Sequence, residues 1–249
     1  MMQMTETVKQ LLIINIILFF GSKLVPAAYE YLAISYFENP TFKFWQPITY
    51  MFMHGNFGHI FFNMFALYAF GSTLEYLWGA RKFLFFYLSC GLGALFFQTI
   101  INYFQFHNAL DLLISAGYEK ADIFNELYTG QYKYNIGWLE VLGTNDFTTF
   151  KDTYLTKTLG ASGAIYGLLA AFAFIFPNAE LALMFIPIPI KAKIFVPILI
   201  AIDLFSGVTG RSLMGDNIAH FAHVGGALVG ILIILYWKKN QFNTNRWDQ

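Results

Sequence analysis

The sequence predicts an all-α membrane protein, built as a bundle of six transmembrane helices with a single domain over residues 1–249. Hydrophobic residues make up 57% of the chain and charged residues only 12%, which is far from the balance of a soluble domain. The mean hydropathy of +0.52 over 249 residues calls for several spans rather than one anchor. Six apolar segments are separated by polar, Pro- or Gly-containing segments.

Charge and cysteine content exclude several classes of protein. The formal net charge is zero, so nothing points to a nucleic acid or an acidic partner. The single Cys90 lies in an apolar run and has no second cysteine with which to form an internal disulfide. The lipid bilayer is therefore the expected environment.

The first predicted span covers about 10–24. Its short apolar core resembles the hydrophobic region of a signal peptide, but further spans follow and no persuasive cleavage site does, so we expect an uncleaved helix. Pro26 ends it, and Ala27–Tyr36 is predicted as a short amphipathic segment. The loop that follows, through Trp45-Gln46-Pro47, has the aromatic and proline content of a segment lying in the membrane interface.

The second and third spans are predicted at about 57–77 and 83–104. The second begins with polar residues, because His54 precedes it and His59 and Asn63 lie four residues apart on one helical face. Histidines at the end of a span default to a functional hypothesis.

A polar insertion of about 105–158 follows the third span and is richer in acidic residues than the rest of the chain. We predict a long polar loop between the third and fourth spans. Short helical patterns occur at 108–115 and 121–127, and strand-like or turn-like pieces occur around Tyr132–Val141.

The fourth span is predicted at 160–176. Its 17 residues reach roughly 25 Å, less than the ~30 Å of the hydrocarbon core. We therefore expect the helix to begin below the membrane surface, next to water near Ser162. A short loop with Pro187 and Pro189 leads to the fifth span at 194–209, and the sixth is predicted at 218–237.

The short basic segments predict the orientation. Most lysines and arginines of these segments fall on one side of a six-span arrangement, which places both termini in the cytoplasm by the positive-inside rule. The opposite short segments contain only Lys23, Lys43 and Arg211. The residues on the basic side are Lys9, Arg81, Lys82, Lys191, Lys193, Lys238, Lys239 and Arg246.

Ser162 has two readings. Small residues such as those of Gly163-xxx-Gly167 allow helices to approach closely, so the serine can serve packing alone. A serine at a helix N-terminus can instead be a nucleophile whose own N–H points at an oxyanion. Gly226-xxx-Gly230 lets the sixth span approach the fourth, which would bring a histidine of the sixth span, such as His223, within reach of the hydroxyl. A neutral histidine bonded to a carbonyl is the structural alternative for each histidine.

Three motifs taken together resemble those of the rhomboid family of intramembrane serine proteases, over about Leu11 to Trp237. They are Gly160-Ala161-Ser162-Gly163 with Tyr166, His59-xxx-Asn63, and Ala222-His223-Val224-Gly225-Gly226-xxx-Gly230. Each is weak alone, but on the second, fourth and sixth of six spans the combination is specific. The bacterial-type six-span core of this family is the nearest match.

The resemblance implies a Ser–His dyad, with Ser162 as nucleophile and His223 as general base and acid. His59 and Asn63 would stabilise the oxyanion, and Tyr166 would stack on His223. The resemblance also implies transmembrane protein substrates, cut near the non-cytoplasmic face without a cofactor or metal. Gly160, Gly163, Gly226, His54 and His220 would support the site. The absence of a seventh span favours a bacterial inner membrane.

Several features depart from the family or leave alternatives open. Trp45-Gln46 stands where many members carry Trp-Arg, so the anchoring of the first loop is expected to differ. His220 is a second candidate base, and Asp216 is a candidate third member or, by preference, a cap of the sixth span. We expect Asp203 and Glu75 to be structural partners rather than catalysts.

Other functions stay open. A catalytically inactive, client-binding relative is the main alternative, although it need not retain Ser162, His223, His59 and Asn63. A metal-dependent protein is disfavoured because the chain has no His-Glu-x-x-His motif. A transporter is disfavoured because no inverted repeat is evident.

Overall fold

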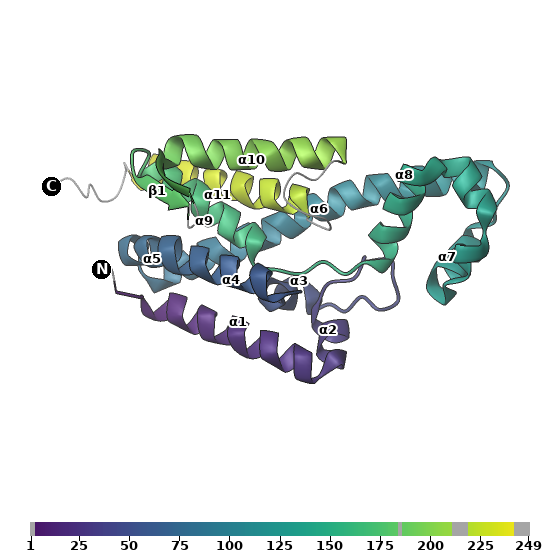
Figure 1. Cartoon of the computed structure of the whole chain (residues 1–249), viewed down its shortest axis with the longest axis horizontal. Coiled ribbons are helices and arrows are strands. Elements are labelled where there is room, and N and C mark those ends of the chain that lie inside the picture. Colours follow the sequence, from purple (N-terminus) through teal and green to yellow (C-terminus); the bar gives the residue numbers. More distant parts are fainter. Residues whose placement is uncertain (1–2, 184–185, 211–218, 242–249) are drawn as a thin grey trace.

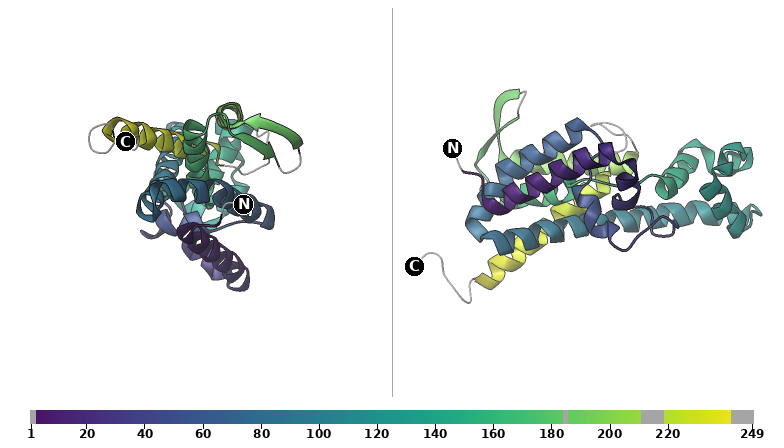
Figure 2. Two further views of the ribbon diagram at one scale, coloured as in Figure 1. Left: turned by 90° about the vertical axis from the view of Figure 1, so that its left-hand side faces the viewer. Right: turned by 90° about the horizontal axis from the view of Figure 1, so that it is seen from below.

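The computed structural model describes residues 3–183, 186–210 and 219–241 of the chain. Arg211, Asp216, the start of the predicted sixth span and Arg246 lie outside these residues. The membrane part is a bundle of helices whose long axes run roughly side by side, and a smaller helical part projects from one end (Figure 1). The start of α1 and the end of α11 both lie at the other end of the bundle, on different sides of it (Figures 1 and 2).

Helices form nearly all of the described structure. The elements of the membrane part are α1 (Glu6–Leu24), α2 (Pro26–Leu32), α3 (Gln46–Thr49), η1 (Tyr50–Phe52), α4 (Phe57–Ala66), η2 (Leu67–Gly71), α5 (Ser72–Trp78), α6 (Ala80–Ser115), α9 (Ser162–Ile175), β1 (Glu180–Leu183), β2 (Ile186–Lys191), α10 (Ala192–Thr209) and α11 (His220–Gln241). Between α6 and α9 lie α7 (Lys120–Thr129), η3 (Gln131–Tyr134) and α8 (Ile136–Leu155).

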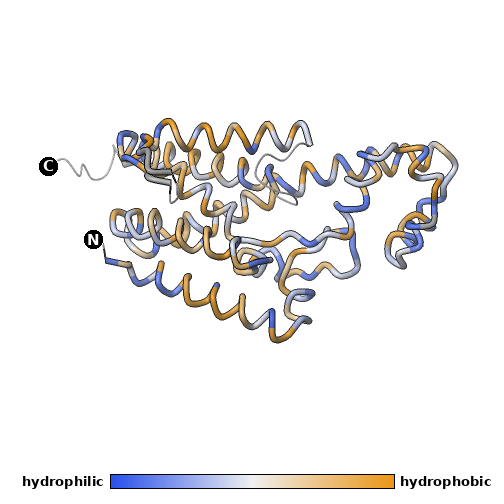
Figure 3. Tube along the Cα trace, viewed as in Figure 1, coloured by the Kyte–Doolittle hydropathy of each residue, from blue (hydrophilic) through white to orange (hydrophobic). Residues whose placement is uncertain are grey.

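The all-α membrane class is confirmed, whereas the count of six spans is not. Within the described residues, four helices are long and apolar enough to cross a bilayer, namely α1, α6, α10 and α11. The predicted fourth span is α9, an apolar helix of only 14 residues. The predicted second span is one helical path divided into α4, η2 and α5, because a π-helical turn interrupts it at Leu67–Gly71. Figure 3 shows the apolar character of these helices.

The prediction of a long polar loop over 105–158 was wrong, because this region is helical and has its own core. Helix α6 continues through the predicted loop start to Ser115; its 36 residues span roughly 54 Å at 1.5 Å per residue, well beyond the hydrocarbon core. Helices α7 and α8 fold back against its far end (Figure 1).

The sequence signal that was missed is the recurrence of apolar residues three or four positions apart. It occurs in Phe106–Leu110–Leu113, in Ile123–Leu127 and in Trp138–Leu142, all of them buried in one cluster. The residues around Tyr132–Val141, predicted as strand-like or turn-like, belong to η3 and to the start of α8. The helical patterns at 108–115 and 121–127 are confirmed as the end of α6 and as α7.

The segment between α9 and α10 also differs from its prediction. In place of a simple loop, β1 and β2 form an antiparallel hairpin, with Glu180 opposite Lys191 and Leu181 opposite Ile190. Pro187 and Pro189 fall in β2, which is an edge strand within a two-stranded sheet and so tolerates residues without an N–H.

The core of the bundle is the contact of α9 with α6 and α11, and glycines make it close. A methyl group built at Gly226 would meet the Gly163 backbone, and one built at Gly230 would meet the Gly167 backbone. The predicted approach of the fourth and sixth spans through Gly226-xxx-Gly230 is thus present in the structure. Glu75 has the structural role expected of it, because it accepts hydrogen bonds from Thr5 Oγ1 (2.5 Å) and Val8 N (2.9 Å) at the start of α1.

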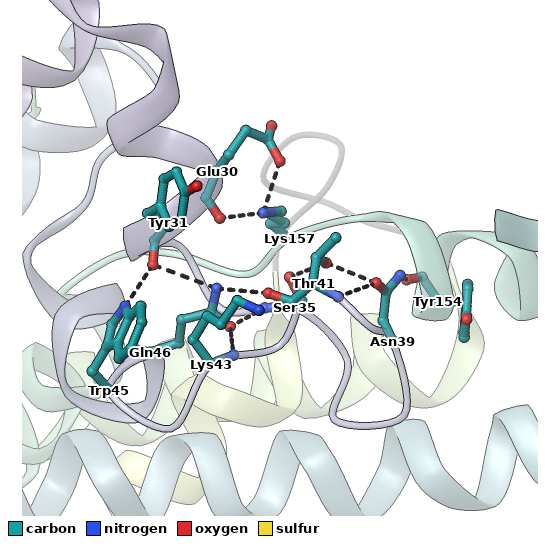
Figure 4. Close-up of polar contacts among 10 residues, drawn as sticks. All are labelled: Glu30, Tyr31, Ser35, Asn39, Thr41, Lys43, Trp45, Gln46, Tyr154 and Lys157. Atoms are coloured by element: carbon teal, nitrogen blue, oxygen red, sulfur yellow. Dashed lines mark hydrogen bonds and ion pairs between the residues drawn. The ribbon is translucent and has the colours of Figure 1, made fainter. Parts of the chain in front are cut away.

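The first loop is anchored by Gln46 (Figure 4). The Gln46 side chain is fully buried. Its oxygen accepts hydrogen bonds from Ser35 N (3.2 Å) and Lys43 N (3.1 Å), and its nitrogen donates to Thr41 O (3.3 Å). Trp45 donates its indole N–H to Tyr31 O at 2.9 Å. An uncharged amide therefore does the anchoring.

The same loop contacts the insertion. Ile34 and Thr158 exchange two backbone hydrogen bonds of 3.0 and 2.9 Å. Figure 4 shows that Lys157 pairs with Glu30, at 2.8 Å. His107 of α6 contacts the Glu38 carboxylate at 2.7 Å. Burial and then the Glu38 carboxylate raise the pKa of Tyr36 above its ordinary value, so its phenol stays neutral.

Candidate active site

The backbone around Ser162 changes from an extended segment to a helix. Gly160 has φ +126°, a conformation that favours glycine, and its N–H donates to Tyr50 O at 2.9 Å. Ser162 is the first residue of α9, so its own N–H is one of the helix's free N-terminal donors. The serine is only partly buried, whereas Gly163 and the following residues to Ala171 are buried.

His223 lies in the first turn of α11 and faces this serine. Its Nε2 is 2.8 Å from Ser162 Oγ, which is hydrogen-bond distance. The ring of Tyr166 stacks on the imidazole with centroids 4.2 Å apart and planes at 11°. The structure therefore brings together Ser162 and Tyr166 of α9 and His223 of α11.

Asp203 is a member of this cluster that the sequence reasoning set aside as a structural partner. It comes from α10 and is 1% exposed. Its Oδ1 lies 3.1 Å from His223 Nδ1 and 2.6 Å from His220 Nδ1, and its Oδ2 accepts the hydroxyl of Tyr166. The signal that could have found it is a carboxylate in the interior of an otherwise apolar span.

His220 lies beside Asp203, with its Nδ1 2.6 Å from Asp203 Oδ1. The hydrogen bond that the structure gives its Nδ1 is the one to Asp203. Asp216, the other candidate helper, lies outside the described residues.

His59 and Asn63 lie on α4 across from the start of α9. A Cβ built on Gly160 would be 2.7 Å from His59 Nε2 and 3.7 Å from Ser162 Oγ, so the imidazole borders the serine. Asn63 is 6% exposed, and its side-chain nitrogen has no hydrogen-bond partner among the described residues. A buried donor without a partner is costly, and such donors at a reactive serine are suited to a charge that develops during reaction.

His54 stands behind His59, in the loop before α4. The two rings contact edge to face with centroids 5.0 Å apart. Burial, followed by the proximity of His59, lowers the pKa of His54 to about 3, so its imidazole is neutral at ordinary pH. Its contact supports a packing role for His54.

The cluster has the chemistry of nucleophilic catalysis, namely a hydroxyl, an acceptor imidazole and further donors. Among the described residues, no group of three or more His, Cys, Asp or Glu side chains is arranged to hold a metal ion.

Comparison with known protein families identifies a match that covers most of the chain. A sequence model of the Rhomboid domain matches residues 41–118 and 130–240. The two matched stretches contain every one of the site residues named above, and the gap between them, 119–129, covers α7 and the residue before it.

Curated relatives agree with that match. An uncharacterised mitochondrial rhomboid protein of Schizosaccharomyces pombe is 29% identical over 215 residues, covering 79% of this chain and 52% of its own. Rhomboid protein 1, mitochondrial, of Saccharomyces cerevisiae is 26% identical over 189 residues, covering 76% and 40%. Rhomboid protease AarA of Providencia stuartii is 27% identical over 203 residues, covering 78% and 56%. The chain thus spans about half the length of these relatives.

Proposed function

The chain belongs to the rhomboid family, and we propose that it is an intramembrane serine endopeptidase with Ser162 as nucleophile and His223 as general base and acid. The observation that carries the proposal is the 2.8 Å distance between Ser162 Oγ and His223 Nε2. A relative from Providencia stuartii is named a rhomboid protease.

The reaction proposed is acyl transfer to the serine followed by hydrolysis. His223 Nε2 takes the hydroxyl proton as Ser162 Oγ bonds to the carbonyl carbon of the substrate, and it gives that proton to the leaving amine as the peptide bond breaks. Water then attacks the acyl-enzyme, with His223 again as base. Tyr166 limits the orientations of the imidazole through its stacked ring.

The oxyanion of the tetrahedral intermediate needs hydrogen-bond donors in place before the reaction. The Ser162 N–H at the start of α9, the His59 ring and the Asn63 amide are the donors that we assign to it. The unpartnered nitrogen of Asn63 and the closeness of His59 to Gly160 support this assignment.

Transmembrane segments of other proteins are the proposed substrates. The reacting serine lies at the start of a helix of 14 residues within a membrane bundle, at the end that faces the insertion. We propose that this end is non-cytoplasmic, because most basic residues of the short segments lie at the opposite end. A bacterial inner membrane stays a prediction, since the relatives are mitochondrial and bacterial.

The test is cleavage of a transmembrane test substrate in proteoliposomes. Wild-type protein is compared with Ser162→Ala, His223→Ala and the buried but uninvolved Leu168→Met, each checked for an unchanged melting temperature. We expect cleavage by wild type and Leu168→Met and none by the other two. A fluorophosphonate probe should label wild type and leave Ser162→Ala unlabelled.

The outcomes separate the two readings of the family. Cleavage that persists in Ser162→Ala would refute the nucleophile. Folded wild-type protein that neither cleaves nor labels would instead indicate a client-binding relative without activity.

A further inference from the structure

Helix α10 carries one acidic residue, Asp203, and that residue is buried in the bundle. Asp203 is 1% exposed, and a buried carboxylate in a membrane bundle is unfavourable unless it is fully hydrogen-bonded. Its neighbour one turn along, Ser206, is equally buried, yet its hydroxyl has no partner among the described residues. The polar contacts are therefore specific to Asp203 rather than to this stretch of helix.

Both oxygens of Asp203 are engaged by groups of the candidate site. Oδ1 meets Nδ1 of His223 at 3.1 Å and Nδ1 of His220 at 2.6 Å, and Oδ2 accepts the Tyr166 hydroxyl. These partners come from α9 and α11, so three helices converge on one carboxylate.

These contacts determine which nitrogen of His223 carries the proton. A carboxylate only accepts hydrogen bonds, so the ring nitrogen that faces it must be N–H. In a neutral imidazole the other nitrogen is then the acceptor. For His223 that nitrogen is Nε2, which lies 2.8 Å from Ser162 Oγ. The stacked ring of Tyr166 fixes the plane of the imidazole but does not distinguish its two nitrogens.

We propose that Asp203 is a positioning residue that holds His223 in the tautomer able to take the proton of Ser162, and that His220 and Tyr166 hold the Asp203 carboxylate in place. This inference rests on the proposed function, and it extends the Ser–His pair to a Ser162–His223–Asp203 series. His220 acts through Asp203 and is not the base.

The rival explanation is that Asp203 only ties α10 to α9 and α11. Asp203→Asn separates the two, because the amide preserves size and can still bond its neighbours. Its NH₂ group can donate to Nδ1, however, and so favours the wrong tautomer of His223. In soluble Ser–His–Asp enzymes that change lowers turnover by up to ~10⁴-fold.

The experiment has two readouts on the full chain in detergent. The first is the ¹⁵N spectrum of histidine-labelled wild type in neutral to alkaline buffer, with the His223 signals assigned by their loss in His223→Gln. We expect a protonated Nδ1 and an unprotonated Nε2. The second is cleavage of the test substrate by wild type, Asp203→Asn, Asp203→Glu and the matched control Ser206→Ala. We expect Asp203→Asn to lose about 10²- to 10⁴-fold in kcat with KM little changed. The kcat of Asp203→Glu should lie between those of Asp203→Asn and wild type, and the kcat of Ser206→Ala should equal that of wild type.

The two readouts keep the inference and the proposed function apart. A wild-type His223 that is protonated on Nε2 overturns the inference whether or not the protein cleaves anything. Equal kcat for folded Asp203→Asn and wild type also overturns it while leaving the serine protease intact. If Asp203→Asn fails to fold, the wild-type tautomer alone decides. Absence of both cleavage and fluorophosphonate labelling in folded wild type refutes the proposed function, and the spectrum still reports on Asp203.

Discussion

Replacing Gly226 by alanine should inactivate the protein by separating two helices. The contact between Gly226 of α11 and Gly163 of α9 lies beside the candidate catalytic pair, because Gly163 follows Ser162 and Gly226 is three residues after His223. A Cβ at Gly226 would overlap the carbonyl oxygen of Gly163 and lie 2.7 Å from its carbonyl carbon. Ordinary carbon–carbon contacts lie at about 3.5–4.0 Å.

The magnitude follows from that overlap. The helices must move apart by roughly 1 Å to restore a normal contact, since the obstacle is backbone and cannot rotate away. The same shift would lengthen the Ser162–His223 distance from 2.8 Å to about 3.8 Å, beyond hydrogen-bond range. A misplacement of 1 Å can cost ~10² in rate, and overpacking costs about 1–3 kcal/mol of stability.

The assay is kcat for the test substrate in proteoliposomes, with the melting temperature measured in parallel. Two further alanine variants form a graded series. Gly230→Ala meets the Gly167 backbone at 2.9 Å, farther from the serine, whereas Gly21→Ala in α1 has nothing within 4 Å of its new methyl group. We expect Gly226→Ala to lose ~10²-fold or more, Gly230→Ala less, and Gly21→Ala nothing. Full activity in Gly226→Ala would refute the view that this glycine contact sets the catalytic distance.

Three further results are expected. Asn63→Ala should lower kcat by ~10²–10³ while fluorophosphonate labelling persists, because it removes an oxyanion donor and not the nucleophile; an unchanged kcat would remove Asn63 from the site. Trp138→Ala, at a fully buried position of α8, should destabilise the insertion by about 3–5 kcal/mol and make it sensitive to limited proteolysis. Leu139→Ala, at a position that is 40% exposed, should do neither, and equal protease resistance of the two variants would contradict a separate insertion core. Gln46→Ala should lower stability by roughly 2–4 kcal/mol, measured by thermal unfolding against the exposed Phe44→Ala, because two backbone N–H groups lose their acceptor; matching melting curves would show that the first loop is anchored by other contacts.

The sequence was most informative where one physical rule dominated. Hydropathy identified the membrane class, and the glycine spacing at Gly226 and Gly230 identified the partner of α11, because close backbone approach has few other uses in a span. The approach of His223 to Ser162 was expected from the small-residue faces of the fourth and sixth spans. Their roles stay a proposal.

It was least informative where several weak signals competed. The insertion is polar on average, and its acidic content favoured a loop over the helices that the spacing of its apolar residues indicates. In the structure such apolar residues, including Trp138 and Phe150, are buried. Asp203 could not be assigned to His223, because the sequence does not show which side chains of the other helices lie beside a single carboxylate in a span. The short α9 and the π turn before α5 are tertiary details that hydropathy does not distinguish from ordinary spans.

The two backbone hydrogen bonds between Ile34 and Thr158 influence how such a chain can evolve. The insertion begins on α6, a single helix continuous with the bundle, and it ends at two backbone hydrogen bonds just before Gly160. Both of its attachment points thus lie on backbone that belongs to the bundle and to the first loop. Because the cost of closing a longer or shorter connection grows only slowly with length, the intervening helices are a replaceable module. Natural variation or engineering can exchange them while the register from Thr158 to Ser162 is preserved.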